Sequence, residues 1–294
     1  MQTTQPIKTK ILANYTNKLA WASQTLERIR AFLVPLHAHL KGRQAEEYTT
    51  LPALVRFAIY YIQHTISRTP PLPIEFRQRI PGEGATDAGA TQTAGGVGGW
   101  YGTDTNNKWN LRWFMVPVTP QTHAWAYEDK DPQRFIAALE LLGDIYYTEM
   151  IGHDHPGQAG THLATATTDN QGNKYIINKH STMKYPNMCL LMHLVDQLNK
   201  HDLYLRVEHK DRTHIEWADQ LASQDSTGFD PVKRFKPTLH LDIFEQTKRM
   251  AREMGLHKPK DVKTHNHKQK LRDLAYTAKA TGKQPGHWKQ RPQL

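Results

Sequence analysis

Residues 84–101 read GATDAGATQTAGGVGGWY and contain the pattern from which the fold can be predicted. Small residues surround one carboxylate, Asp87, and a glycine-rich run then leads to the aromatic pair Trp100 and Tyr101. Glycine permits a tight reversal without a side-chain clash, and Val, Trp and Tyr favour the extended backbone of a strand. The stretch therefore predicts a β-hairpin, with its turn at the glycines and with Asp87 on its first strand.

The composition limits the classes of protein to which the chain can belong. Its 294 residues suffice for one large domain or two small ones, and 38% of them are apolar, enough for a packed core. The single cysteine, Cys189, excludes a disulfide framework and fits a reducing compartment. No apolar run approaches the about 20 residues that span a bilayer, and residues 1–6 lack the apolar core of a signal peptide. We expect an intracellular protein, nuclear or cytoplasmic, without a membrane partner.

The net charge of +10 lies entirely near the C-terminus. Residues 248–294 contain 13 Lys or Arg and three acids, which gives 13 − 3 = +10, so residues 1–247 sum to zero. A localised basic segment indicates a polyanion partner. A solvated, partly disordered tail that aids solubility explains the charge equally well. Both interpretations of the basic tail, assigned to residues 229–294, stay open.

Apolar periodicity predicts a small helical unit followed by a mixed α/β domain. The first helix is expected over 18–34, ended or kinked by Pro35, and the second begins with Thr50 as N-cap and Pro52 in its first turn. After the hairpin, strands are expected at 111–118, 161–168 and 203–207, and helices at 133–151, 173–180, 186–198 and 214–223. Three antiparallel strands followed by strands joined through helices predict a mixed five-stranded sheet with flanking helices.

Four acids fall at the ends or centres of these elements. Asp87 is on the first strand, Glu140 in the helix after the hairpin, Asp169 at the end of the fourth strand and Asp219 in the last helix. A strand end and the flanking helices share one edge of a sheet, so the carboxylates can converge, and a divalent cation then relieves their repulsion. Mg²⁺ prefers oxygen ligands, and two such ions about 4 Å apart clamp a phosphodiester. The simpler alternative is that individual acids are turn or cap residues, since the chain has 28 acids.

The residues around each acid resemble the ribonuclease H domain of retroelement reverse transcriptases, most closely that of DIRS-type tyrosine-recombinase retrotransposons. Four segments carry the likeness in the family's order: Thr86-Asp87-Ala88 with Gly98-Gly-Trp100 for "TDAS…GWG", Leu139-Glu140-Leu141-Leu142 for "LELLA", Thr168-Asp169-Asn170 with Ile177-Asn-Lys179 for "DN…YINK", and Trp217-Ala-Asp219-Gln-Leu221-Ala-Ser223 for "WADxLSR". The resemblance implies a ribonuclease H-like fold for the domain at 79–228.

The N-terminal unit, residues 1–78, is similar to the segment of the same family that closes the reverse transcriptase thumb and connects it to ribonuclease H. Lys18-Leu-Ala-Trp-Ala22, followed by Arg30-Ala-Phe-Leu33 and Leu36, resembles "GKLNWA…GRAFLRxLxDL". The likeness then extends over about residues 15–225. In that family the polymerase palm lies upstream of this segment and would be outside this chain; a free-standing protein and a part of a longer product both stay open.

By this resemblance, Asp87, Glu140, Asp169 and Asp219 bind two Mg²⁺ ions, for which Mn²⁺ can substitute. One ion activates a water and the other stabilises the leaving 3′ oxygen as the RNA strand of an RNA–DNA hybrid is hydrolysed. His209, ten residues before Asp219, matches the spacing of a histidine that assists proton transfer or product release in cellular ribonucleases H; the alternative is a surface histidine, one of 17.

Asn170, Gln171 and Lys179 are the candidates for contacts with the nucleic-acid backbone. Two main functions remain open at this point, beside a third alternative, which is another nuclease or integrase of the same fold that acts on DNA. The first is a Mg²⁺-dependent endonuclease that acts on RNA–DNA hybrids, favoured by acids at all four motif positions. The second is a ribonuclease H-fold module that binds nucleic acid without cutting it, a decayed or domesticated retroelement fragment. Departures from the motifs, such as Gly89 and Ile215, favour the second.

Overall fold

A computed structural model describes residues 5–68, 78–128, 130–156 and 162–257 of the chain. Residues 1–254 group into one compact unit and residues 255–294 into a second. The elements below all belong to the first unit. In the part of the chain that the structure describes, no helix is both long enough and apolar enough to cross a membrane.

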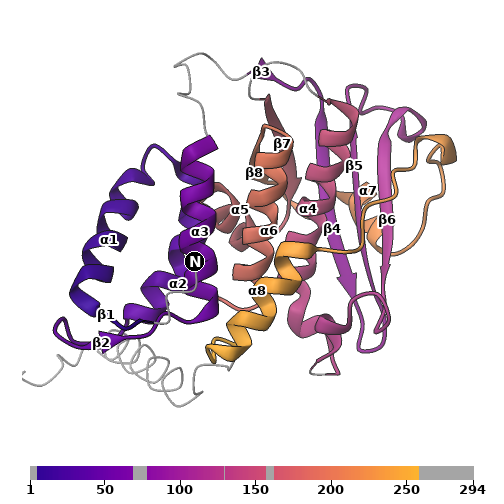
Figure 1. Ribbon diagram of the computed structural model, residues 1–294. Coiled ribbons are helices and arrows are strands. Elements are labelled where there is room, and N and C mark those ends of the chain that lie inside the picture. Colours follow the sequence, from indigo (N-terminus) through magenta and orange to yellow (C-terminus); the bar gives the residue numbers. More distant parts are fainter. Residues whose placement is uncertain (1–4, 69–77, 129, 157–161, 258–294) are drawn as a thin grey trace, which may run out of the picture. The chain divides into compact units, whose positions relative to one another are not determined.

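A mixed sheet is the scaffold of the part of this unit that follows the N-terminal helices (Figure 1). The strands β4 (Glu83–Ala90), β5 (Gly95–Gly102) and β6 (Arg112–Val118) form an antiparallel meander. The strand β7 (His162–Thr168) pairs in parallel with β4, and β8 (Leu203–His209) in parallel with β7. The strands follow the order β6-β5-β4-β7-β8, and the predicted mixed sheet is confirmed; the two-residue strand β3 (Gln78–Arg79) adds a sixth strand, paired with β7.

Helices cover both faces of the sheet. The faces are identified by two neighbours on β4: the Thr86 hydroxyl donates to Asp144 of α4 (Ile136–Asp154), whereas Ala85 packs among Ala218 and Leu221 of α7 (Glu216–Ala222). Since successive strand residues point to opposite faces, α4 and α7 lie on opposite sides of β4. The other described helices of this domain are α5 (Gln171–Lys179), α6 (Asn187–Lys200) and α8 (Asp242–Glu253). The helix α8 packs on α6 and lies within the segment that was assigned to the tail.

Short elements complete the path of the chain. The two-residue strands β1 (Ile7–Lys8) and β2 (Tyr48–Thr49) pair with each other beside the N-terminal helices. Turns of 3₁₀ helix occur at η1 (Glu27–Ile29), η2 (Lys108–Asn110), η3 (Ala124–Tyr127), η4 (Pro132–Phe135), η5 (Arg212–His214) and η6 (Pro231–Lys233).

The N-terminal helices differ from the prediction of one helix over 18–34. The chain forms α1 (Thr9–Ala22) and α2 (Arg30–Leu40), and Pro35 lies inside α2 rather than ending it. A proline there removes one backbone donor, but residues 31–36 are all buried, and this burial outweighs the loss. The third helix, α3 (Ala53–Arg68), follows as expected.

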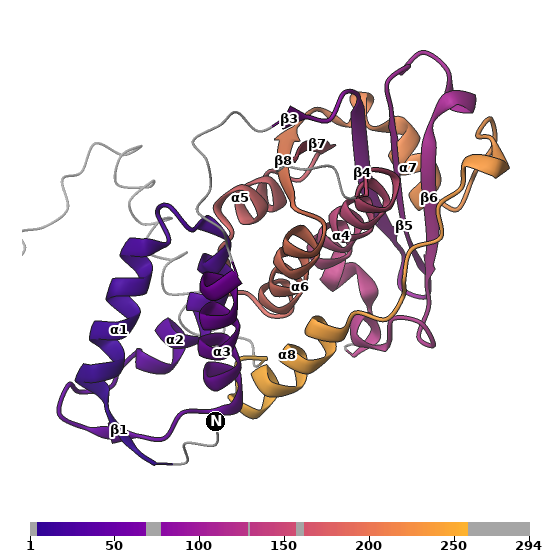
Figure 2. The same ribbon diagram turned by 45° about the horizontal axis from the view of Figure 1, so that its top comes forward.

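Figure 2 shows the helical unit beside the helices α6 and α8. Polar contacts join this helical unit to the sheet domain. The Arg28 guanidinium lies 4.3 Å from the centre of the Tyr204 ring and donates to the carbonyl of Leu203 at 2.6 Å. The Tyr61 hydroxyl donates to Asp196 Oδ1 at 3.0 Å and accepts from the side-chain amide of Asn199 at 3.0 Å. The helices therefore dock on α6 and β8 through a defined hydrogen-bond network.

The glycine-rich run at residues 95–99 does not form the turn, contrary to the sequence prediction. The reversal lies at Thr91–Ala94, where the Thr91 N–H donates to the Ala94 carbonyl at 2.7 Å, and the glycines lie within β5. A Cβ at Gly96 or Gly98 would collide with the backbone of Ala222, at the end of α7. These positions lack side chains because α7 lies directly on the backbone of β5.

We predict that Gly98→Ala destabilises the protein by about 1–3 kcal/mol, because the added methyl would overpack against α7. Gly89→Ala is the matched control on the adjacent strand, since a Cβ at Gly89 meets nothing within 4 Å. Urea unfolding of both variants measures the difference. Equal stabilities would mean that the contact between α7 and β5 tolerates a side chain.

Candidate active site

Three of the four predicted acids converge near the C-terminal end of the strand β7. Asp87, Glu140 and Asp169 each offer a carboxylate oxygen, and these three atoms all lie within 4.8 Å of one another. They come from β4, from α4 and from the residue after β7. The parallel pairing of β4 with β7, in which Ala85 lies opposite Thr167, brings Asp87 level with Asp169.

Backbone and side-chain amides orient the two buried members of this acid cluster. Asp87 is 6% exposed, and its Oδ1 accepts a hydrogen bond from the Ala88 N–H at 2.8 Å. Glu140 is 8% exposed, and its Oε2 accepts from the side chain of Asn173 at 3.1 Å. Asn173 also donates to the Ala137 carbonyl at 2.9 Å, so the amide ties α5 to the turn of α4 before Glu140.

The start of α5 links Asp169 to Glu140. Asn170 follows Asp169 directly and is the N-cap of α5, because its Oδ1 accepts from the Asn173 N–H at 3.1 Å. The side chain of the same Asn173 reaches Glu140. The cap therefore fixes the first turn of α5 between the two acids, and Asn173 is a positioning residue that the sequence analysis missed.

Burial and mutual repulsion raise the pKa values of the buried acids. Burial is the main cause that raises the pKa of Asp87 to about 7, and the charges of Asp169 and Asp219 act in the same direction. Burial also raises the pKa of Glu140 to about 8, with further contributions from Asp87 and Asp169 and against a hydrogen bond from Asn170. At neutral pH the cluster therefore holds protons that a cation would displace.

A third buried carboxyl, Asp144, lies one turn after Glu140 on α4 and was also missed. It is 1% exposed, its Oδ1 accepts from the Thr86 hydroxyl at 3.0 Å, and its Oδ2 has no partner among the described residues. Burial raises its pKa to about 7. Its position could have been predicted from the spacing: Asp144 follows Glu140 by four residues, and residues i and i+4 share one face of a helix.

Asp219 does not belong to the cluster of three. It lies on α7, where its Oδ1 accepts from Arg212 Nη2 at 2.8 Å, and its charge contributes to the raised pKa of Asp87. It is thus a neighbour of the cluster that an arginine already engages. Ile215, which occupies a motif position where the resembling family has Asn, is fully buried with Ala218 and Leu221 and anchors α7.

The remaining predicted site residues lie outside the cluster. His209 is the last residue of β8, not part of the following loop, and is exposed. Gln171 and Lys179 are exposed on α5, where the Lys179 ammonium lies 5.2 Å from the centre of the Tyr175 ring. Asn170 is partly buried, with the capping role given above. Their roles in catalysis and nucleic-acid binding stay predictions.

The donor set of the cluster fits a hard divalent cation. Around one octahedral Mg²⁺, neighbouring ligand oxygens are about 3 Å apart and opposite ones about 4 Å apart. A spread of up to 4.8 Å therefore requires the three carboxylates to close around the ion. The three carboxylates, without His or Cys, favour Mg²⁺ or Mn²⁺ over zinc.

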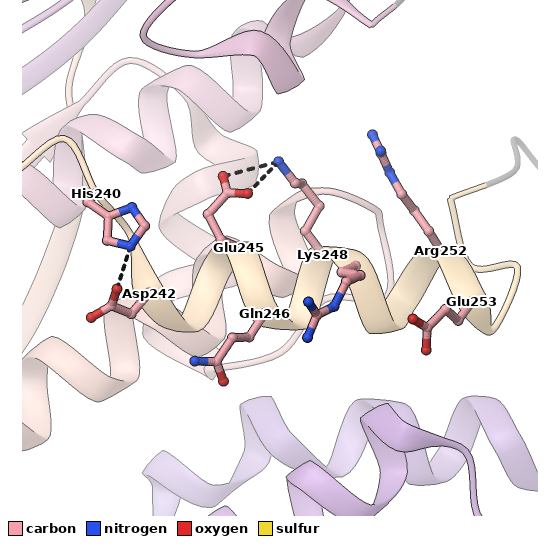
Figure 3. A pocket seen from close by; sticks show the side chains of 8 residues that line it. His240, Asp242, Glu245, Gln246, Lys248, Arg252 and Glu253 are labelled. Atoms are coloured by element: carbon pink, nitrogen blue, oxygen red, sulfur yellow. Dashed lines mark hydrogen bonds and ion pairs between the residues drawn. The ribbon is translucent and has the colours of Figure 1, made fainter.

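A separate pocket runs along α8 (Figure 3). Its lining carries charges of both signs, and one ion pair within it joins Lys248 to Glu245 at 2.9 Å. It shares no residue with the acid cluster: the lining consists of His240, Asp242, Glu245, Gln246, Lys248, Arg249, Arg252 and Glu253. The pocket therefore has no part in the candidate active site.

Comparison with known proteins finds similarity only among solved structures, since no family model and no curated protein matches the sequence. Ribonuclease H1 of the archaeon Halobacterium salinarum NRC-1 is similar over 50% of this chain and 96% of its own, with 14% identity and a TM-score of 0.34. LC11-RNase H1, solved with an RNA/DNA hybrid, has 14% identity over 49% of this chain and 95% of its own, with a TM-score of 0.35.

A reverse transcriptase is also among these structures. Prototype foamy virus protease-reverse transcriptase has 16% identity and a TM-score of 0.33, and the similarity covers 65% of this chain but 29% of the viral one. At these identities and TM-scores the likeness assigns no activity to this chain. A functional conclusion therefore has to come from the acid cluster and its surroundings.

Asp144 makes the stability depend on pH. Between the pKa of an unfolded Asp, about 4, and the folded value of about 7, the unfolded chain releases a proton that the folded chain retains. Stability therefore falls as pH rises through this window, by up to about 1.4 kcal/mol per pH unit from this group. We predict that Asp144→Asn removes this part of the slope.

Urea unfolding between pH 4 and pH 8, without divalent cations, measures the slope for the wild type and for Asp144→Asn. Glu46→Gln is the control, because it removes an acid whose side chain is 72% exposed, and it should keep the wild-type slope. A slope that Asp144→Asn leaves unchanged would mean that the Asp144 carboxyl is ionised in the folded protein.

Proposed function

We propose that this chain is a divalent-metal-dependent ribonuclease H that hydrolyses the RNA strand of RNA–DNA hybrids and derives from a DIRS-type retroelement polyprotein. One observation carries the proposal. Asp87, Glu140 and Asp169, which occupy three of the four motif positions, offer oxygens within 4.8 Å of one another although they come from three separate elements. A purely structural set of turn and cap acids has no reason to meet in this way, since unpaired carboxylates repel.

Asp87, Glu140 and Asp169 would hold one Mg²⁺ or Mn²⁺ ion, and Asp87 with Asp219 would hold a second. Bound divalent ions supply Lewis-acid chemistry, which makes water a better nucleophile and stabilises a leaving oxygen. The residues of the chain orient this site: Ala88 donates to Asp87, and Asn173 donates to Glu140. His209 would assist proton transfer, and Asn170, Gln171 and Lys179 would contact the nucleic-acid backbone.

The exposed face of α5 supports a nucleic-acid partner. Tyr175, 51% exposed, offers a ring on which a base or sugar can stack, and Lys179 beside it offers a positive charge to a phosphate. Discrimination of RNA from DNA would rest on the width of the minor groove and on contacts to 2′-hydroxyls.

A second candidate function is nucleic-acid binding without cleavage. The observation that favours it is the position of Asp219, which pairs with Arg212 and lies outside the cluster of three acids. A site that cannot complete its second ion would bind a hybrid and one cation but hydrolyse slowly. The assay that follows separates these candidates directly.

We predict that purified protein with Mg²⁺ cleaves the RNA of an end-labelled hybrid, and that Asp87→Asn or Asp169→Asn lowers the rate by more than about 100-fold. Loss of a ligand should exceed the 10- to 100-fold effect typical of a residue that supports a ligand, and Asn173→Ala should fall within that smaller range. The matched control is Glu208→Gln, which removes a nearby acid of β8 outside the cluster. Hybrid binding without cleavage by the wild type would favour the second candidate, and cleavage that survives Asp169→Asn would refute the site.

The raised pKa values predict how cation binding depends on pH. A protonated carboxyl is a poor ligand, and the pKa values of Asp87 and Glu140 are about 7 and about 8. Lowering the pH from 8.5 to 6.5 should therefore weaken the affinity for Mn²⁺, with proton release on binding that increases toward lower pH within this range. Titration calorimetry in buffers of different ionisation enthalpy measures both quantities; an affinity independent of pH would contradict the assignment of these two acids as ligands.

A further inference from the structure

Arg212 is placed to control the fourth acid. It lies on η5, directly before α7, and its Nη2 donates to Asp219 Oδ1 at 2.8 Å. The side chain of Arg212 is 71% exposed and that of Asp219 is 37% exposed, so the pair is accessible from solvent. The ion pair thus holds one carboxylate oxygen of Asp219 against the guanidinium.

The positive charge of Arg212 also acts on other members of the site. Asp219 is the main cause that raises the pKa of Arg212, and Asp87 and Asp169 contribute in the same direction. Lys210, two residues earlier in the same loop, is directed instead to Glu83 at 3.7 Å. Of the two positively charged side chains, Arg212 is therefore the one that faces the acids of the candidate active site.

We propose that Arg212 holds Asp219 as an internal counter-ion until a phosphate of the nucleic acid takes the guanidinium, which frees Asp219 to bind a second divalent ion. The inference rests on the proposed function, because it requires a cation at the acid cluster and a phosphodiester partner. It makes the second ion site conditional on the substrate.

Competition for Asp219 is the physical basis of this coupling. Arg212 occupies Oδ1 of Asp219, one of the two oxygens that a cation can use, and a guanidinium and a divalent cation repel each other. Arginine binds phosphate through two parallel hydrogen bonds and keeps its charge at any working pH, so an arriving phosphate offers it an equivalent partner. Since an exposed ion pair contributes little, the expected effect on the affinity for the second ion is about two- to fivefold.

The first test is titration calorimetry of the full chain with Mn²⁺ in the absence of nucleic acid. We assign the weaker of two Mn²⁺-binding phases to the second ion. Arg212→Gln should tighten this weaker phase about two- to fivefold. Arg212→Lys keeps the positive charge but loses the planar set of donors, and should have a smaller effect. Lys210→Gln is the matched control. It also removes one positive charge from the same loop, but Lys210 pairs with Glu83 and not with Asp219. In an Asp219→Asn background, Arg212→Gln should no longer change the weaker phase.

The second test repeats the titration in the presence of a hybrid whose RNA strand carries 2′-O-methyl groups and is not cut. The hybrid should tighten the weaker phase in the wild type and have much less effect in Arg212→Gln. By linkage, Mn²⁺ at the second site should strengthen hybrid binding by the same factor. Thermal unfolding checks that each variant is folded.

Three results would overturn the inference: an Arg212→Gln variant that behaves like Lys210→Gln, an effect of Arg212→Gln that persists without Asp219, or a hybrid effect that does not need Arg212. A wild type that binds no divalent ion would overturn it together with the proposed function. Coupled ion and hybrid binding without any cleavage would support the inference and refute only the enzymatic activity.

Discussion

The direct contact between α7 and the backbone of β5 determines where the fourth acid can lie. Gly96 and Gly98 allow this approach, since any side chain there would collide with the end of α7. Ile215, Ala218 and Leu221 then fill the space between the helix and the sheet, with Ala85 as their neighbour on β4. The packing of α7 therefore fixes Asp219 on the sheet face to which Asp87 also points.

The acid cluster depends on a second constraint, which is that three different kinds of element meet at one strand end. The parallel pairing of β4 and β7 aligns Asp87 with Asp169, and the cap of α5 carries Asn173 to Glu140. Each link is a backbone or amide hydrogen bond rather than an ion pair. These bonds hold the carboxylates buried and close together, which raises the pKa values of Asp87 and Glu140. A bound cation would relieve the repulsion between them.

Much of this arrangement could be predicted from the sequence because it depends on the periodicity of apolar residues and on the order of the motifs along the chain. The strands and helices of the sheet domain follow from alternation and from apolar spacing, and Asp87, Glu140 and Asp169 lie on the first strand, in the following helix and directly after the fourth strand, as expected. What could not be predicted depends on contacts between distant segments. The glycines of β5 looked like a turn because the helix that needs them is more than 100 residues away in the chain.

The same limit explains the residues that were missed. Asn173 and Arg212 are polar residues in polar stretches, and only the folded contacts distinguish them from their neighbours. Asp144 was detectable in principle, as an acid in an apolar helix one turn from Glu140. Of the two effects expected of Pro35, an end or a kink, the helix end is wrong, because the buried residues around Pro35 keep α2 helical.

The hydrogen bonds of Arg28 and Tyr61 have a practical consequence for how this protein can be divided. Resemblance to a known family puts a boundary near residue 78, but Arg28 donates to the Leu203 carbonyl of β8 and Tyr61 to Asp196 of α6. A fragment that begins at the hairpin would leave this carbonyl and carboxylate to water and would uncover the Tyr204 ring. The boundary that the resemblance implies therefore does not coincide with a gap in the physical contacts, and a fragment cut there would expose unpaired polar groups and an aromatic ring on its outermost strand, β8.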